Sequence, residues 1–316
     1  MYKNIIPGLV SFETKVRHLS GCYISADFDA YPPVSAPAAF HYVLMVEKGL
    51  SFPADCQFRH QSYFKSGECW YYERKLAPGV PLRFSYDPSK KVFRFNEMLR
   101  RVPLNIGGIL PAGGHISNII ALDLLLEGYV LLRGNAMAFG DRAVCVLGPG
   151  SNGKTTILKR ALDMGARYVS DELLLLDMEC KTAFPISLAG NLGRRTNRQL
   201  KRDLRDSTRA VTAPLEVGGL FLIQNISGRQ TGTASPEKDW LDYLYMLSLG
   251  EFYNSPFITA FVHEEGLTGE LFNRFDMARN LCWDVSFVRV NDYDFSELLE
   301  MMARIGTPSE GPTGKR

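Results

Sequence analysis

The sequence predicts an α/β protein in which a smaller β-rich module precedes an α/β core. Three observations support this fold class: short apolar and aromatic runs divided by turn residues up to about residue 100, a glycine-rich loop between an apolar run and a potential helix at 144–158, and alternating strand and helix patterns after it. We place the β-rich module at 1–103, the core at 104–305 and a flexible tail at 306–316.

Composition narrows the function classes. Of the 316 residues, 46% are apolar and 22% are charged, as in an ordinary soluble protein, and the net charge of +2 favours neither nucleic acid nor a membrane surface as partner. The six cysteines form no C-x-x-C pair, which argues against a metal cluster or a disulfide framework. No signal-peptide core opens the chain and no apolar run approaches a membrane span of about 20 residues. We therefore expect a cytoplasmic protein.

The β-rich module carries its strand signals in runs rich in Val, Phe and Tyr. Turn residues such as Pro78-Gly79 separate these runs, which is typical of antiparallel strands, and 86–92 predicts a hairpin. His18, His41 and His60 are far apart in sequence, so no catalytic constellation is visible in this module. The predicted strands are 42–46, 70–72, 82–86 and 92–95.

The core alternates helices and strands. Ser117 is a suitable N-cap for a helix that Gly128 ends, and Gly165 ends the helix after the glycine-rich loop. The predicted helices are 117–127, 155–164, 239–249 and 295–305, and the predicted strands are 129–132, 133–139, 144–147, 173–176, 219–223 and 286–290.

The glycine-rich loop carries the first chemical signal. Gly148–Thr155 matches G-x-x-x-x-G-K-[ST], the P-loop that holds nucleotide phosphates with its backbone N–H groups and with the positive end of the following helix. Lys154 is expected to reach the β- and γ-phosphates, and the Thr155 hydroxyl to bind Mg²⁺. The predicted cofactor-binding residues are Gly148, Gly150, Ser151, Asn152, Gly153, Lys154, Thr155 and Thr156.

Two adjacent acids, Asp171 and Glu172, are the second signal. They follow a short apolar run, where a charge is costly unless it is paired or bound to metal. In a P-loop protein such acids coordinate Mg²⁺, act as a general base, or both.

A basic stretch lies at 194–209, with seven cationic side chains against two acidic ones. Spacings of three and four residues would align several of the cations on one helical face. The stretch is either a solvated helix or a surface for phosphate or an acidic peptide. RNA is a more remote alternative, because no aromatic residues interleave the cations.

With the P-loop and the turn Ser170-Asp171-Glu172, the chain resembles the HPr kinase/phosphorylase family, over about residues 104–305. It is most similar to shorter members that include kinases of ribosomally made peptides such as lasso precursors. The resemblance implies the P-loop kinase fold shared with phosphoenolpyruvate carboxykinase, ATP and Mg²⁺ as cofactors, and a hydroxyl as acceptor. It implies catalytic roles for Lys154 on the phosphates and for Asp171 as proton acceptor, with Thr155 and Glu172 at the metal.

The resemblance also bears on the acceptor. Arg133 stands where the family often has His, and the downstream glycine-rich signature of bona fide HPr kinases is not found, so HPr is not the expected substrate. A Ser or Thr of a peptide or protein is the first hypothesis. A small-molecule hydroxyl kinase and a non-catalytic nucleotide-binding regulatory protein stay open as alternatives, and so does assembly into a homo-oligomer. Nucleic acid and membrane are not expected partners.

Overall fold

A computed structural model of the chain describes residues 2–16, 33–60, 62–96, 112–148, 153–171, 173–186, 210–223, 253, 255–284, 286–290 and 294–306. These residues form a mixed α/β structure with two sheets and five helices. The α/β class predicted from the sequence is confirmed to this extent. They group into two compact units. The first holds the described residues up to Asp123 and those from Tyr253 to Leu271, and the second holds those between Leu124 and Ile223 and from Phe272 onward.

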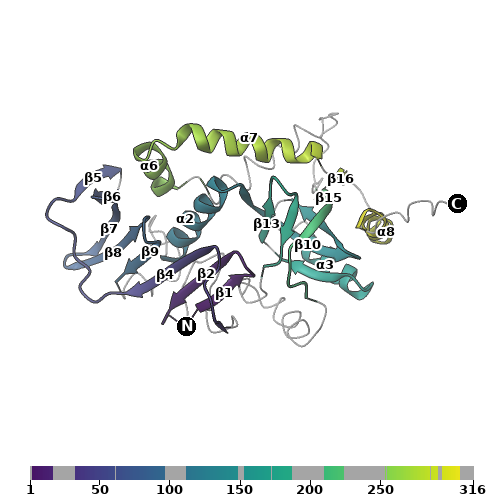
Figure 1. Cartoon of the computed structure of the whole chain (residues 1–316), viewed down its shortest axis with the longest axis horizontal. Coiled ribbons are helices and arrows are strands. Elements are labelled where there is room, and N and C mark those ends of the chain that lie inside the picture. Colours follow the sequence, from purple (N-terminus) through teal and green to yellow (C-terminus); the bar gives the residue numbers. More distant parts are fainter. Residues whose placement is uncertain are drawn as a thin grey trace, which may run out of the picture. The chain divides into compact units, whose positions relative to one another are not determined.

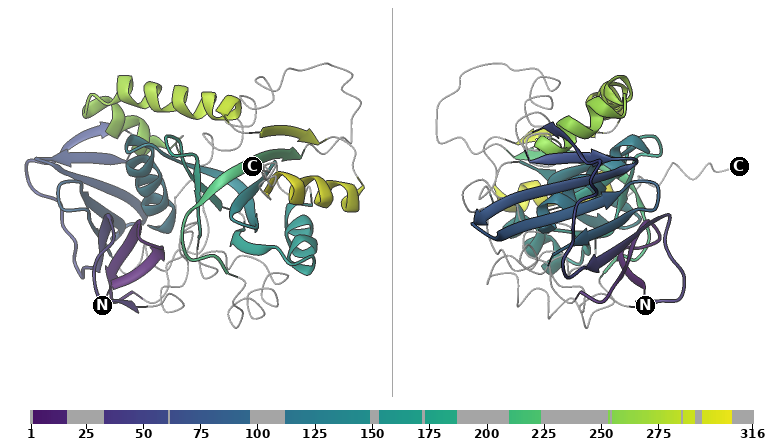
Figure 2. Two further views of the ribbon diagram at one scale, coloured as in Figure 1. Left: turned by 45° about the vertical axis from the view of Figure 1, so that its right-hand side comes forward. Right: turned by 90° about the vertical axis from the view of Figure 1, so that its left-hand side faces the viewer.

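The first unit is built on a nine-stranded sheet with the order β3-β1-β2-β4-β9-β8-β7-β6-β5. Its strands lie side by side in Figure 2. They are β1 (Tyr2–Ile6), β2 (Val10–Thr14), β3 (Pro33–Val34), β4 (Phe40–Val46), β5 (Gln57–His60), β6 (Tyr63–Ser66), β7 (Cys69–Ala77), β8 (Val80–Asp87) and β9 (Val92–Phe95). The four strands predicted in this module are all present, and the predicted hairpin joins β8 to β9, where Asp87 pairs with Val92.

The pairing of β4 corrects the expected antiparallel arrangement. β4 runs parallel to both of its neighbours, β2 and β9, whereas β5 to β9 pair antiparallel in sequence order. The chain leaves β4 in the middle of the sheet, starts again at the far edge with β5, and returns strand by strand until β9 lies beside β4. Runs of apolar residues indicate where strands form, but they do not specify that the chain passes from β4 in the middle of the sheet to β5 at its edge.

Two helices, α2 (Ala112–Leu126) and α6 (Pro256–Glu264), lie beside this sheet (Figure 1). Their rings contact aromatic side chains of the sheet. His115 of α2 stacks on Phe84 of β8, with ring centroids 5.2 Å apart. Phe257 of α6 meets Trp70 of β7 edge-on at 5.6 Å. α2 begins five residues before the predicted Ser117, because burial of the segment around His115 outweighs the low helix propensity of its glycines.

One cluster of polar groups in the first unit is centred on Asp123. The carboxylate of Asp123 accepts hydrogen bonds from the phenols of Tyr42 (2.8 Å) and Tyr86 (3.3 Å) and from the ammonium of Lys91 (2.9 Å). Burial, and then the charge of Asp123, raise the pKa of both phenols well above the ordinary value. These phenols therefore stay protonated and keep donating to the carboxylate.

The second unit contains a sheet whose pairings close on themselves. β11 pairs with β10, β10 with β13, β13 with β14, β14 with β15, and β15 runs back parallel to β11. β16 extends the sheet beyond β15, and β12 pairs with β10. The strands are β10 (Tyr129–Phe139), β11 (Arg142–Leu147), β12 (Arg167–Ser170), β13 (Leu173–Asp177), β14 (Thr182–Phe184), β15 (Leu215–Ile223) and β16 (Ser286–Val290).

β10 is one strand where the sequence predicts two, at 129–132 and 133–139. The predicted break falls between Leu132 and Arg133, but the strand continues through it, and Gly134 just after it allows a close approach of strands. A Cβ at this position would lie 2.9 Å from Leu147 Cδ2 and 3.0 Å from the carbonyl oxygen of Val146. Gly134 therefore lets β11 pack against β10 and does not end the strand.

Helices α3 (Lys154–Asp163) and α8 (Phe295–Gly306) share an apolar core with β10, β11 and β15 (Figure 2). Ile157 and Leu158 of α3 and Met302 of α8 are buried in it with Val146. Both helices agree with prediction to within one residue at each end, and α8 includes the first residue of the predicted tail. The fifth described helix is α7 (Thr268–Asp284), and none of the described helices is long and apolar enough to cross a membrane.

Candidate functional site

The P-loop pattern lies at the carboxyl end of β11. Leu147 ends the strand. The two glycines that the P-loop pattern requires have positive φ angles, +139° at Gly148 and +88° at Gly153. Side chains with a Cβ rarely adopt such values, which explains glycine at both positions. Residues 149–152, between them, lie outside the described part of the chain.

Helix α3 starts directly after the loop and has the properties of an anion-binding helix end. Its N-cap is Gly153, which supplies no side-chain oxygen to the N–H groups of the first turn. Those N–H groups and the helix dipole favour a negative charge in front of the helix. The strand, loop and helix therefore occur in the order that the sequence pattern requires.

Lys154, the first residue of α3, contacts the residue that follows β11. Its Nζ donates a hydrogen bond of 2.8 Å to the carbonyl oxygen of Gly148. This contact brings the ammonium to the end of β11, where the loop begins. An ammonium can exchange a neutral carbonyl partner for a phosphate oxygen with a gain in electrostatic energy.

Asp171 meets the same helix from β12. β12 ends at Ser170, and the next residue, Asp171, is only 3% exposed. The hydroxyl of Thr155, in the first turn of α3, donates to Asp171 Oδ1 at 3.3 Å. The structure thus brings together one predicted metal residue and the predicted catalytic acid, which are 16 residues apart in the sequence.

Several predicted site residues lie outside the described residues. They are Gly150, Ser151 and Asn152 of the loop, and Glu172. The basic stretch 194–209 and the predicted helix 239–249 are outside as well, so their roles stay predictions. Thr156 is described and its side chain is exposed. Gly148, Gly153, Lys154, Thr155 and Asp171 are the predicted residues that the structure gathers in one place.

Sequence reasoning missed one polar residue of the second unit, Asn135. Its side chain is 1% exposed in β10. A signal was present, since an amide interrupts an otherwise small and apolar run, 134–139. The sequence could not show its neighbours, because those depend on the register of β10 with two other strands.

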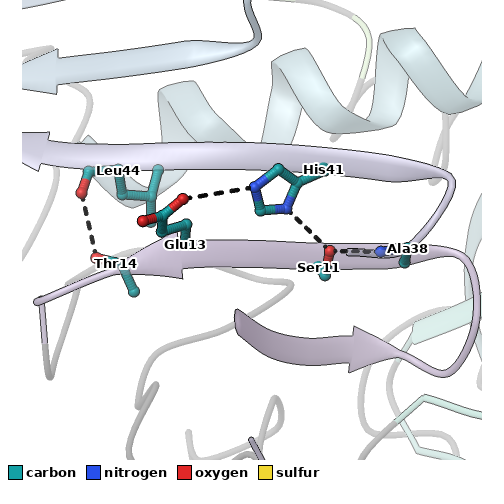
Figure 3. A network of polar contacts seen from close by, with 6 residues as sticks. All are labelled: Ser11, Glu13, Thr14, Ala38, His41 and Leu44. Carbon is teal, nitrogen blue, oxygen red and sulfur yellow. Dashed lines mark hydrogen bonds and ion pairs between the residues drawn. The ribbon is translucent and has the colours of Figure 1, made fainter. Parts of the chain in front are cut away.

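The first unit holds a Ser–His–Glu cluster that superficially resembles a nucleophile with its base (Figure 3). Ser11 Oγ lies 3.1 Å from His41 Nδ1, and His41 Nε2 lies 3.9 Å from Glu13 Oε2. Ser11 is completely buried and accepts the backbone N–H of Ala38 at 2.9 Å. A substrate cannot reach this hydroxyl, so the cluster stabilises the β2–β4 pairing and offers no reactive serine.

Comparisons with known proteins give a partial likeness among solved structures. No family model matches the sequence, and no curated protein matches it. Among solved structures, the chain is similar to the HPr(Ser) kinase/phosphatase from Coxiella burnetii, with 15% identity and a TM-score of 0.23. The similarity covers 34% of this chain and 73% of that one. Such a TM-score is too low to show a shared fold, so the proposals below rest on the residues of the site.

Proposed function

We propose that the protein is an ATP-dependent kinase of the HPr-kinase-like type, which transfers the γ-phosphoryl group of ATP to a Ser or Thr hydroxyl of a peptide or protein. The observation that carries this proposal is the contact between Thr155 Oγ1 and Asp171 Oδ1 at 3.3 Å. In P-loop enzymes a Ser or Thr at the start of the helix and an acid from a neighbouring strand hold the metal together. The Thr155–Asp171 contact therefore favours a nucleotide and metal site over a glycine-rich turn that contains a lysine by chance.

The residues at the end of β11 suit a nucleotide with its metal. Mg²⁺ prefers oxygen ligands, and the hydroxyl of Thr155 and the carboxylate of Asp171 offer two oxygens within hydrogen-bond distance of each other. When bound, the ion would neutralise charge on the phosphate oxygens. Lys154 would exchange the Gly148 carbonyl for the β- and γ-phosphates, and the first-turn N–H groups of α3 would support the same anion.

Asp171 has two carboxylate oxygens for two tasks. Oδ1 is the atom that meets Thr155, which favours a place beside the metal more directly than the proton-acceptor role implied by the resemblance. We propose that Oδ2 receives the proton of the acceptor hydroxyl. The acceptor oxygen then forms a bond to the γ-phosphorus, the bond from that phosphorus to the β–γ bridging oxygen breaks, and ADP leaves. Glu172 is proposed to assist at the metal.

The acceptor class is proposed from the sequence. The basic stretch 194–209 suits an acidic or extended peptide, and a ribosomally made precursor peptide is the specific substrate that we propose. Such a substrate is made in the cytoplasm, which agrees with the proposed location.

The experiment uses the purified chain with ATP, Mg²⁺ and a mixed pool of host-cell peptides and metabolites. Mass spectrometry should reveal products heavier by the mass of one phosphoryl group, and ATP turnover should rise when the acceptor pool is added. The Asp171→Asn variant is run in parallel and should bind ATP without forming the product. The peptide fraction, supplied alone, should retain the activity.

Three results would contradict this proposal. ATP binding by the wild-type protein without any phosphorylated product would favour the nucleotide-binding regulatory alternative. Products confined to the metabolite fraction would favour the small-molecule kinase. An Asp171→Asn variant with wild-type turnover would remove Asp171 from the chemistry.

A further inference from the structure

The strand β5 is the last strand of the nine-stranded sheet in the first unit (Figure 1). Its pairing with β6 uses one of its two edges, and no other described strand pairs with the second edge. The N–H and C=O groups of such an edge can form a ladder with a strand of another chain. Proteins often prevent this with Lys or Pro on the edge strand, and β5 contains neither. Within the described part of the chain, the edge is therefore open to a further strand.

Phe58 of β5 places an exposed aromatic ring beside this edge. The residue is 58% exposed, and its ring meets that of Phe64 on β6 edge-on, with centroids 5.7 Å apart. The register of β5 shifts between Phe58 and His60, so the regular part of the edge ends at Phe58. A second strand on this edge would therefore cover apolar surface of Phe58 as well as pair with the backbone.

The opposite face of the edge carries a cation and an anion. Arg59 of β5 lies beside Glu264 of α6, with 3.5 Å between Nε and Oε2, and the two side chains are 30% and 31% exposed. One strand further into the sheet, Lys65 and Glu265 form a closer pair at 2.6 Å. These two pairs carry no net charge, so they favour neither an acidic nor a basic peptide as partner. They are complementary to themselves, because a two-fold axis can set the cation of one copy against the anion of another.

We propose that two copies of this chain associate through their β5 edges, as antiparallel strands related by a two-fold axis perpendicular to the sheet. In this arrangement the ring of Phe58 packs against its counterpart, and Arg59 of each copy lies near Glu264 of the other. The inference goes beyond the proposed function and is independent of it, since it uses a surface of the first unit and no residue of the P-loop. The short regular edge makes this a weak, concentration-dependent dimer.

The test is sedimentation velocity of the purified full chain between about 1 and 100 µM protein. The dimeric fraction of wild type should rise with concentration. Phe58→Glu should raise the Kd of the dimer by about 10-fold or more, because it removes the apolar contact and brings two like charges together at the axis. Phe272→Glu is the matched control, since Phe272 is 65% exposed but lies in the second unit, and it should associate like wild type. Thermal unfolding confirms that each variant is folded.

A second pair of variants tests the charges. Arg59→Glu gives the edge two neighbouring anions and Glu264→Arg gives it two cations, so each variant alone should associate more weakly than wild type. An equal mixture of the two should associate about 10-fold more tightly than either alone, because an acidic edge then meets a basic one.

Four results would each overturn the inference. They are a wild type that stays monomeric, which would leave the edge to a peptide partner, a Phe58→Glu variant that dimerises like wild type, an equal loss in Phe272→Glu, and a mixture of the charge variants that associates no more tightly than its components.

Discussion

The two units bury polar groups for different purposes. In the first, Asp123 is surrounded by Tyr42, Tyr86 and Lys91, and further along the same unit Glu265 accepts from Lys65 at 2.6 Å and Trp70 at 3.2 Å. Each carboxylate has several donors from different elements. In the second unit, Asp171 accepts a hydrogen bond from the Thr155 hydroxyl in the first turn of α3. The ammonium of Lys154, the preceding residue of that helix, donates to the carbonyl of Gly148.

This difference separates stabilising from reactive polar groups. A carboxylate fixed by two or three donors holds elements together, and a ligand would have to displace strong partners to reach it. Asp171 and Lys154 stand at a strand end and a helix start, where partners can be exchanged for phosphate and metal. Substitutions in the first unit should therefore change stability, and substitutions around α3 should change binding and transfer.

The largest effect is expected for Lys154→Ala. Removing this ammonium should weaken ATP binding and lower phosphoryl transfer by about 100- to 1,000-fold, because no other described residue of α3 replaces its charge at Gly148. Calorimetry and a transfer assay measure the two losses. Lys159→Ala, the same change five residues along α3, is the control and should bind ATP like wild type. Equal nucleotide affinity in all three proteins would exclude Lys154 from the phosphate site.

The next effect is on stability, for Asp123→Leu. It leaves two buried phenols and an ammonium without their common acceptor and should lower the free energy of unfolding by about 3 kcal/mol. Urea unfolding measures this loss. Glu127→Gln, which also removes one negative charge but at an exposed position, should unfold like wild type. ATP affinity should be unchanged in both, and its loss in Asp123→Leu would break the distinction between the two units.

A smaller effect is expected for Tyr42→Phe, which removes one of the three donors. At neutral pH it should cost about 1 kcal/mol. Burial raises the pKa of Tyr42, so folding favours the protonated phenol. The resulting stability is complete below the unfolded pKa of about 10 and is lost as pH rises from there toward the folded pKa. Urea unfolding between neutral and alkaline pH should show a gap between wild type and Tyr42→Phe that narrows above pH 10; a constant gap would contradict the shift.

The smallest effect concerns His41 (Figure 3). Burial lowers the pKa of its ring, and the nearby charge of Glu13 opposes this by raising it. Because the folded pKa is lowered, the stability from neutral His41 is complete above its ordinary pKa of about 6.5 and is lost as pH falls below it. Glu13→Gln should deepen this loss. Urea unfolding at neutral and mildly acidic pH measures this loss of stability. A Glu13→Gln variant that loses less stability on acidification than wild type would contradict the role given to Glu13.

Local features of the fold were predictable because local chemistry sets them. The P-loop pattern located the strand before Gly148 and the helix after it, and the turn at Asp87-Pro88 located a hairpin. The division of 129–139 into two strands was wrong, because β10 is continuous and Gly134 lies inside it, where it allows a close approach of β11. The start of α6 carried a signal that was overlooked, Ser255 as N-cap followed by Pro256, with Ser255 Oγ accepting from the Ile258 N–H at 3.2 Å.

Non-local features could not be predicted from one sequence. β4 runs parallel to β9, which follows it in the chain after four intervening strands, and to β2, from which β3 separates it, and no residue pattern specifies these pairs. The candidate site shows the same limit. Lys154, Thr155 and Asp171 follow from spacing and residue type, whereas the contact between Thr155 and Asp171 depends on how the end of β12 lies against α3.

The central claim is that the start of α3 holds nucleotide phosphate with a metal shared between Thr155 and Asp171. The most direct measurement is calorimetric titration with ATP, with and without Mg²⁺, of wild type and of Thr155→Val, which removes the hydroxyl and keeps the shape. Wild type should bind ATP more tightly with Mg²⁺, and Thr155→Val should lose that increase while still binding ATP alone. Absence of binding by wild type, or an unchanged Mg²⁺ effect in Thr155→Val, would contradict the claim.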